Sequence, residues 1–401
     1  MTSAATAELG LSADADEGAA SSSAQAPGVL RRALARRGAW VGAAWLAVVA
    51  FAGAFAPFIA NSHPLRMVMA DGTTRYPLWE NLSPADVAIP LVLLVIGVTV
   101  LLGRWTRSRW RWGGCAAAAA LVIAGSIVFV NPPQIVVYAQ YRTALADGSA
   151  VSATYTVIPF SPSDRFRDKP ELRHPLPPDT IHWLGTSRRG ADLLSRMIHA
   201  SRVALAVGFI ATGIAMVIGV TLGGLMGYFV GFVDLIGMRL VEVFSAIPVF
   251  FLLLTFVAFF PRNLYLMMVI IGCTGWVGYA RFVRAEFFKL RAMDFVQAGR
   301  ACGLPLWSIL FRHMLPNAIA PVLVAASFGV PSAILYEATL SFLGLGLVDE
   351  PSWGQMLSQA TGAGGGFYWW IAMFPGLAIF LTVFGFNLFG EALRDVIDVK
   401  S

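Results

Sequence analysis

Few side chains in this sequence have the type and spacing that chemistry on a substrate requires. The phosphate-binding pattern GxxxxGK[ST] does not occur, so no ATP site is expected in this chain. No Ser/His/Asp or Cys/His arrangement indicates catalysis, and no spacing is typical of metal ligands. The side chains considered were His63, His174, His182 and His199, together with Cys115, Cys273 and Cys302, which lie in or beside apolar stretches without a CxxC pair. We therefore expect no enzyme activity, no metal and no cofactor in this chain.

Two acidic residues inside apolar runs are the remaining candidates, because an ionisable group in lipid is costly and often functional. Glu242 lies three residues from Arg239, which favours a local helical ion pair over a role in contacting a solute. Glu337, in the stretch ILYEATLSF, has no obvious local partner. It could line a pathway or brace helix packing, and the sequence leaves both interpretations open.

The composition identifies the environment that must position these residues. The 401 residues are 57% hydrophobic and only 13% charged, whereas an ordinary soluble domain carries roughly 25% charged residues. Apolar runs of about 20 residues, the length that crosses a bilayer, recur along the chain. The net charge of +6 comes from basic residues beside these runs, where they set orientation, so nucleic-acid binding is not expected. The sequence predicts an all-α, polytopic bundle of transmembrane helices surrounded by membrane lipid.

The first half of the chain predicts three spans separated by polar segments. Residues 1–30 fit a disordered cytoplasmic tail, and the arginines that follow place the N-terminus in the cytoplasm. The expected organisation is a first transmembrane helix at 31–61, an extracytoplasmic loop at 62–86, a further helix pair at 87–130 and an extracytoplasmic segment at 131–185. A basic, Trp-rich loop at 104–112 joins the pair, and the last segment suggests some extended structure.

The second half predicts five more spans, which brings the total to about eight. Their apolar runs lie at 202–229, 239–260, 266–287, 318–347 and 367–390. Counted from a cytoplasmic N-terminus, they place the loop 288–317 and the C-terminus in the cytoplasm. The charges agree, because basic residues surround that loop, whereas 349–366 contains no Lys or Arg.

The cytoplasmic loop has a composition that is unusual for a connector. Within DFVQAGRACGLPLWSILFRHMLPN (294–317), a run of helix-favouring and small residues ends at Gly303, Pro305 can start a second helix, and Pro316 marks the return to the membrane. Two short helices across the cytoplasmic face are expected. Small residues let another backbone approach, and apolar residues such as Trp307 can anchor in a groove, so the loop predicts a docking surface for a soluble partner.

This loop resembles the EAA coupling loop of the membrane subunits of ABC importers. In that pattern Glu-Ala-Ala is followed after three residues by Gly, and after nine more by an apolar residue, one further residue and Leu-Pro. The spacing is kept, and FRHMLPN resembles the FRHILPN form of the dipeptide and oligopeptide branch. The resemblance implies that contact with the ATPase subunits involves Asp294, Gln297, Ala298, Gly299, Gly303, Trp307, His313, Leu315 and Pro316.

Two residues of the loop depart from the family pattern. Gln297 replaces the acid and Gly299 replaces the second alanine, which leaves open the ion pair that the family glutamate would make with its partner. Asp294, one helical turn earlier, can supply a carboxylate on a similar face. The N-terminal part also departs, because family members usually have one span before the matching region.

The resemblance covers residues 182–401. HWLGTSRRGADLLSRMIHASRVAL (182–205), GYFVGFVDLIGMRLVEVFSAIP (227–248), EATLSFLGLGLVDEPSWGQMLSQA (337–360) and FPGLAIFLTVFGFNLFGEALRDVIDVK (374–400) are each similar to the C-type permeases of that branch. It implies a type I ABC importer permease fold over 186–401, with the coupling loop at 288–317, in the bacterial cytoplasmic (inner) membrane.

By resemblance, the chain forms a heterodimer with a second, related permease and docks two ATP-binding subunits, on which ATP and Mg²⁺ bind. An extracytoplasmic substrate-binding protein delivers the solute. The implied function is the import of dipeptides or oligopeptides, and relatives of the same fold that carry nickel chelates, glutathione or peptide antibiotics leave the solute open. A secondary transporter is a distant alternative, because coupling carboxylates and broken helices near the midplane are sparse.

The polar segment at 182–202 also has two interpretations. It could be an extracytoplasmic amphipathic helix that receives the substrate-binding protein, or a buried helix cap held by Thr186 and Asp192. The residue types favour the cap. In the following span, Gly223 and Gly227 are typical of close helix packing.

Overall fold

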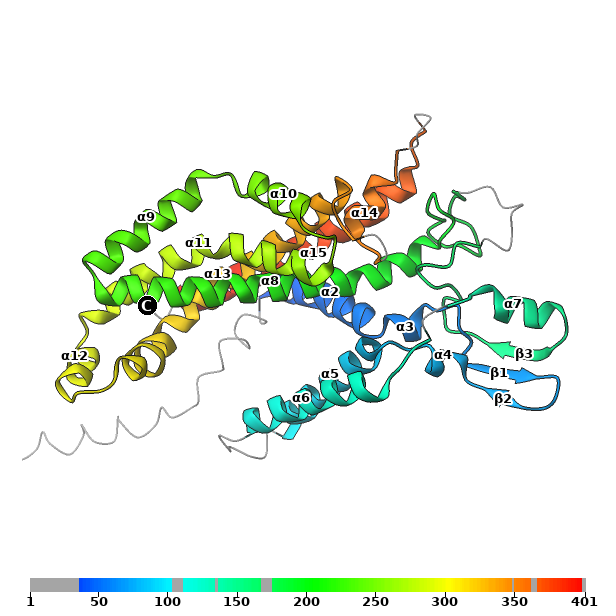
Figure 1. Cartoon of the computed structure of the whole chain (residues 1–401), viewed down its shortest axis with the longest axis horizontal. Coiled ribbons are helices and arrows are strands. Elements are labelled where there is room, and N and C mark those ends of the chain that lie inside the picture. The colour runs from blue at the N-terminus through cyan, green and yellow to red at the C-terminus, as the bar shows by residue number, and fades with distance from the viewer. Residues whose placement is uncertain are drawn as a thin grey trace, which may run out of the picture.

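The computed structural model describes residues 36–102, 111–133, 136–166, 175–347, 350–361 and 366–398. Most of these residues are helical, and five long helices form the central bundle (Figure 1). They are α2 (Arg37–Ala54), α8 (Leu193–Phe229), α11 (Leu264–Arg291), α13 (Leu315–Phe342) and α15 (Trp369–Asp398). The predicted all-α, polytopic fold is confirmed. The expected tail at 1–30 and most of the basic loop at 104–112 lie outside the described residues.

Six helices of the described chain are long and apolar enough to cross a membrane. They are the five helices of the bundle and α5 (Pro84–Leu102). The helix that follows α5, α6 (Arg111–Phe129), has a shorter apolar part, Gly113–Phe129. A helix therefore lies at each position where the sequence predicted a span. Of the described helices, only six are single helices that are long and apolar enough to cross a membrane.

The span expected at 239–260 is wrong in its shape. The chain forms α9 (Phe232–Ala246) and α10 (Val249–Phe259), whose axes differ by 81°. Ile247 between them is extended, with φ −91° and ψ 122°, because a following proline disfavours the helical conformation of the preceding residue. Pro248 itself has no N–H to continue the helical hydrogen bonds. The two helices form an arch beside α8 and α11 (Figure 1).

The segment 182–202 contains the N-terminal cap and the first residues of α8. The helix begins at Leu193, whereas the apolar run predicted a span that begins at 202. The Asp192 carboxylate accepts a hydrogen bond from the Ser195 backbone N–H at 2.8 Å and lies 2.9 Å from Nδ1 of His182. Thr186 Oγ1 accepts from the backbone N–H of Leu176 at 2.7 Å. This geometry corresponds to the structural alternative for the segment, with Asp192 as the N-cap residue.

The helices α8 and α11 approach each other closely because glycines of α8 face the α11 backbone. A Cβ atom at Gly223 would lie 2.5 Å from the carbonyl oxygen of Ala280, and one at Gly227 would lie 2.6 Å from that of Arg284. Any larger residue at either position would push the helices apart. The close packing that the sequence suggested is therefore present in the fold.

A small unit of mixed structure, which we call the β/α unit, comprises residues 56–83 and 136–166 and lies at the far end of the long axis from α12 (Asp294–Ala301) (Figure 1). Its antiparallel sheet has the strand order β2-β1-β3. The elements are α3 (Ala56–Ile59), β1 (Arg66–Met69), β2 (Thr74–Arg75), α4 (Pro77–Glu80), α7 (Ala139–Ala146) and β3 (Ala150–Thr154). Extended structure was predicted near β3, whereas β1 and β2 lie in the segment that we expected to be a plain loop.

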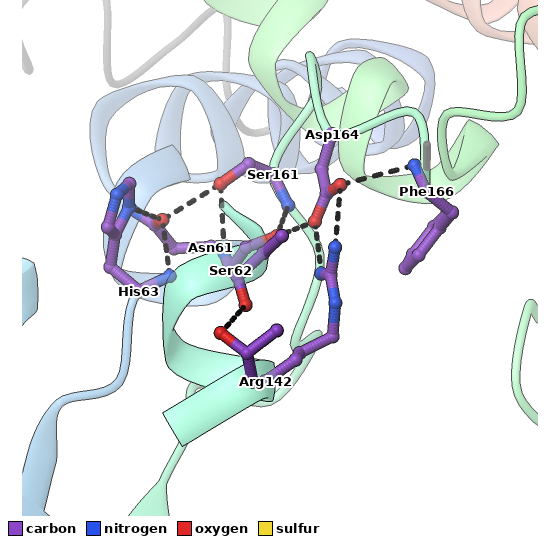
Figure 2. A network of polar contacts seen from close by, with 9 residues as sticks. Asn61, Ser62, His63, Arg142, Ser161, Asp164 and Phe166 are labelled. Atoms are coloured by element: carbon purple, nitrogen blue, oxygen red, sulfur yellow. Dashed lines mark hydrogen bonds and ion pairs between the residues drawn. The ribbon is translucent and has the colours of Figure 1, made fainter. Parts of the chain in front are cut away.

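Asp164 is the centre of the polar network that holds the β/α unit together (Figure 2). Its carboxylate accepts hydrogen bonds from Arg142 Nη1 of α7 at 2.6 Å and from Ser62 Oγ at 2.8 Å. Ser62 and Ser161 also bond reciprocally, each hydroxyl accepting from the other residue's backbone N–H at 2.8 and 2.7 Å. The network thus joins the start of the unit to its end across the long sequence that separates them.

His63 is buried beside this network. Its Nδ1 lies 2.7 Å from Asn61 Oδ1, and its ring contacts the rings of Tyr138 and Tyr141. Burial lowers the pKa of His63 from 6.5 to about 4, against a smaller opposing effect of the Asp164 carboxylate. The imidazole is therefore neutral in the folded unit at neutral pH.

We expect the β/α unit to lose stability as the pH falls. Because the pKa of His63 is lower in the folded than in the unfolded unit, the stabilisation is complete above about pH 6.5 and is lost as the pH approaches about 4. Between pH 7.5 and 5 the free energy of local unfolding should fall by about 2 kcal/mol. Hydrogen exchange of the β1 amides in the assembled complex measures this fall, and His63→Gln should remove most of it. An unchanged pH dependence in that variant would contradict the assignment to His63.

The additional helix pair α5–α6 packs mainly on itself, and among the described residues α5 also contacts α2. Arg202 of α8 forms an ion pair with Asp86 in the first turn of α5. The same guanidinium donates from Nε to the carbonyl oxygen of Gly53 at 2.9 Å, at the end of α2. One arginine therefore ties the extra pair to two helices of the bundle.

Candidate functional site

The segment predicted to couple the chain to a soluble partner starts with the short helix α12. The helix α12 ends at Ala301, and the chain then turns at Gly303, which has φ +69°. The backbone is helical again from Leu306 and continues through the π-helical turns of η1 (Ser308–Met314) directly into α13. The prediction of two separate short helices is therefore right for the first and wrong for the second. Pro316 lies at the junction of η1 and α13, and the helical backbone continues through it.

One side of the coupling segment, which comprises residues 294–316, is anchored to the bundle. Val296, Ile309 and Leu310 are buried against residues of α11 such as Phe287. Arg300 lies over the Tyr228 ring, 4.5 Å from its centroid, and its Nε donates to the Tyr228 hydroxyl at 3.2 Å. Sequence reasoning missed this contact, because the two residues are distant in the chain. It connects α12 to the end of α8, so a movement of α12 reaches the bundle directly.

The other side of the coupling segment presents apolar side chains to the outside. Trp307 is 71% exposed, and Met293, Phe295, Leu304 and Leu306 are also exposed. Trp307 stacks on Phe311, with 3.9 Å between the ring centroids. A rigid aromatic residue surrounded by other apolar residues is the composition expected of an anchor in a partner's groove.

The residues that the resemblance assigned to the contact surface lie mostly on this exposed side. Gln297 is exposed, but its amide donates to the Arg291 carbonyl oxygen at 3.0 Å and so helps to end α11. Asp294 is exposed in the first turn of α12, where a carboxylate interacts favourably with the helix N-terminus. The remaining residues are exposed at Ala298, Gly303, Trp307 and Pro316, and half-buried at Gly299, His313 and Leu315.

The acidic residues singled out in the apolar runs have local partners. Arg239 and Glu242 form an exposed ion pair at 2.6 Å. Glu337 is fully buried and accepts hydrogen bonds from Ser341 Oγ at 2.6 Å and Ser352 Oγ at 2.7 Å. Because Ser352 is the N-cap of α14 (Trp353–Ser358), Glu337 joins α13 to α14. The geometry favours a bracing role for Glu337.

A cavity of about 440 Å³, which we call the central chamber, lies within the arch of α9 and α10 and borders α8, α11 and α13. Arg239, Glu242 and Glu337 do not line it. Its polar lining consists of hydroxyl side chains from Thr212, Ser245, Thr274, Tyr279, Ser332 and Tyr336. Sequence reasoning named none of them. The available signal was the recurrence of single hydroxyl residues in otherwise apolar spans.

Comparison with known proteins identifies the family. The family profile described as binding-protein-dependent transport system inner membrane component matches residues 219–400. The oligopeptide transport system permease protein OppC of Haemophilus influenzae is 39% identical over 221 residues, which cover 55% of this chain and 70% of the relative. The chain belongs to the family of binding-protein-dependent transport system inner membrane components. It is a multi-pass membrane permease subunit of an ABC importer, and membership of this family implies an ATPase partner.

Other permeases of the family show the breadth of the similarity. The glutathione transport system permease protein GsiD of Pectobacterium atrosepticum is 38% identical over 56% of this chain and 74% of its own length. The inner membrane ABC transporter permease protein YejE of Escherichia coli is 32% identical over 90% of this chain and 93% of its own length. The MetNI methionine ABC transporter is similar in structure with a TM-score of 0.40 and 20% identity, over 50% of this chain and 96% of the other.

Proposed function

We propose that this permease imports dipeptides or oligopeptides across the bacterial cytoplasmic membrane. The observation that carries the proposal is the 39% identity to a permease whose name states oligopeptide transport. The permease works in a heterodimer with a second, related permease, and an extracytoplasmic substrate-binding protein delivers the peptide. Its N- and C-termini lie in the cytoplasm, and the β/α unit lies on the opposite side of the membrane.

Two ATP-binding subunits drive transport through the coupling segment 294–316. These subunits, which hold ATP and Mg²⁺, move as they close and open, and the exposed apolar side of the segment follows them. The support for this role is that the segment combines an exposed surface around Trp307 with firm attachment to α8 and α11 through Arg300 and Val296. The coupling segment transmits this movement only if its contacts with the ATPase subunits differ between their open and closed states.

A second candidate solute is glutathione. It is favoured by the 38% identity to the glutathione permease GsiD, which is close to the identity with the oligopeptide permease. The two solutes share peptide groups and carboxylates, so the same membrane architecture suits both. The co-encoded substrate-binding protein then decides which solute reaches the permease.

The test is uptake of labelled di- to hexapeptides into vesicles that contain this chain, the co-encoded permease, the ATPase subunits and the binding protein. Peptide uptake that requires ATP hydrolysis is the expected result. Vesicles without the ATPase subunits, and vesicles given a non-hydrolysable ATP analogue, are the controls. Labelled glutathione in the same vesicles tests the second candidate.

Each alternative outcome has a defined meaning. Uptake in vesicles that lack the ATPase subunits would overturn the ATP-driven mechanism in favour of a secondary transporter. Uptake of glutathione without uptake of any peptide would keep the importer and replace its solute. Stimulation of ATP hydrolysis by a nickel chelate or a peptide antibiotic alone would do the same.

A further inference from the structure

The central chamber lies at mid-height of the bundle. Thr212 is near the middle of α8, Tyr279 is near the middle of α11, and Gly329 is near the middle of α13, and all three line the chamber. These three helices are long and apolar enough to cross the bilayer, so the chamber lies between its two faces. The arch of α9 and α10 completes the wall (Figure 1).

The chamber wall is polar without being charged. Among the described residues that line it, none is Asp, Glu, Lys, Arg or His. Three of the six hydroxyls of the wall are already bonded to neighbouring residues: Ser332 donates to the Phe328 carbonyl oxygen at 2.9 Å, Thr274 donates to that of Ile270 at 3.0 Å, and Ser245 donates to that of Val241 at 2.6 Å. Ser245 accepts from Arg281, whose guanidinium reaches the wall only through this bond at 2.6 Å. The donor hydrogens of these hydroxyls are therefore already used.

Two of the three remaining hydroxyls combine burial with the lack of a partner in the described part of the chain. Thr212 Oγ1 and the Tyr279 hydroxyl are buried and have no hydrogen-bond partner among the described residues. A buried polar group without a partner costs about 1–3 kcal/mol, so such groups call for an explanation. Both residues line the chamber, but these two oxygen atoms are themselves buried, so a solute supplies the partner only when the side chains turn toward it.

The fold holds these two hydroxyls at one place. A Cβ atom at Gly329 of α13 would overlap the Tyr279 hydroxyl oxygen and would lie 3.1 Å from Cγ2 of Thr212. On the other side, a Cβ atom at Gly219 of α8 would overlap Cβ of Tyr279. Tyr279 is therefore enclosed between two glycines of neighbouring helices, which positions its hydroxyl beside Thr212.

We propose that the hydroxyls of Tyr279 and Thr212 bind the backbone peptide groups of the solute as it crosses the middle of the membrane. The inference rests on the proposed function of peptide import. A hydroxyl both donates and accepts, which matches the C=O and N–H of a peptide group. No lining residue is charged, so the site recognises the peptide group that all peptides share, while the Arg281 guanidinium bonded to Ser245 places a positive charge beside the wall. The chamber volume falls within the range of ligand pockets, which is roughly 300–1,000 Å³.

The experiment compares Tyr279→Phe and Thr212→Val with matched controls in the assembled importer. Tyr265→Phe changes a tyrosine of the same helix that is 73% exposed, and Thr221→Val changes an exposed threonine of α8 that bonds to its own helix. The probe is a labelled tripeptide, with an acidic, a basic and a neutral version. Uptake at saturating peptide and ATP hydrolysis are measured in the same vesicles.

Each chamber variant should lower maximal uptake of all three peptides by about three- to tenfold, as expected for the loss of one hydrogen bond. ATP hydrolysis and the controls should stay within about twofold of wild type. Gly329→Ala, which displaces the Tyr279 hydroxyl from another helix, should reproduce the loss. Uptake by Tyr279→Phe and Thr212→Val at the wild-type rate would overturn the site while leaving peptide import intact. A wild-type complex that takes up no peptide would instead overturn the proposed function and, with it, this site.

Discussion

Replacing Gly303 by aspartate is expected to lower ATP-driven uptake by at least about tenfold. Gly303 has φ +69°, and a side chain in this left-handed conformation costs about 1–2 kcal/mol. Among the described residues, none lies within 4 Å of a Cβ atom built there, so the effect comes from the backbone and not from a clash. The strain falls between α12 and the helix that starts at Leu306, where a change of angle disconnects the ATPase subunits from the bundle.

Vesicles that contain the complete importer provide the measurement, and ATP hydrolysis is followed alongside uptake. We expect hydrolysis without uptake, with the complex still assembled in the membrane. Gly148→Asp is the matched control, because Gly148 has φ +79° with open space around it but lies in the β/α unit. Equal losses in both variants would contradict a specific role of the coupling segment.

Replacing Asp164 by asparagine should destabilise the β/α unit by about 3 kcal/mol, because removal of one partner leaves the rest of a buried, hydrogen-bonded charge pair uncompensated. The Asp164 side chain is only 3% exposed and accepts from Arg142 and Ser62 together (Figure 2). An amide presents an NH₂ group to one of these donors, so one favourable contact becomes a repulsive one. Protection of the β1 amides against hydrogen exchange should fall accordingly.

Asp71→Asn provides the control within the same unit. Asp71 is an exposed carboxylate that accepts from the backbone N–H of Thr73 at 2.8 Å, so the same chemical change there removes no buried charge pair. We expect its exchange pattern to stay close to that of wild type, and transmembrane helices should keep their protection in both variants. Unchanged protection of β1 in Asp164→Asn would show that the network does not hold the unit.

Local patterns predicted much of the fold and part of the site. Runs of apolar residues marked the long helices, because a bilayer imposes length and composition on any segment that crosses it. Gly303 marked the end of α12, because φ +69° favours glycine. Asp192 was suggested as a helix cap, a role that depends only on nearby backbone groups such as the Ser195 N–H.

Hydropathy failed where geometry depends on a single residue or on a distant partner. An averaged apolar signal over 239–260 concealed the bend at Pro248, which separates α9 from α10. The strand β1 pairs with β3 from another part of the chain, so neither 62–86 nor 131–185 alone contains the complete sheet. Gln297 occupies the family's acidic position, but its bond to the Arg291 carbonyl oxygen became visible only in the folded chain.

The sequence by itself determined that this chain is a helical membrane protein with a permease-like coupling segment, because those features depend on local composition and on the spacing of nearby residues. Only the tertiary structure decided that the Tyr279 hydroxyl and the Thr212 methyl group meet at Gly329, on three different helices. It also decided that Glu337 is bonded to Ser341 and Ser352 and does not line the central chamber. The physical reason is that a cavity and its unpaired polar groups arise from how helices pack, and this packing brings together residues whose separation along the chain carries no signal.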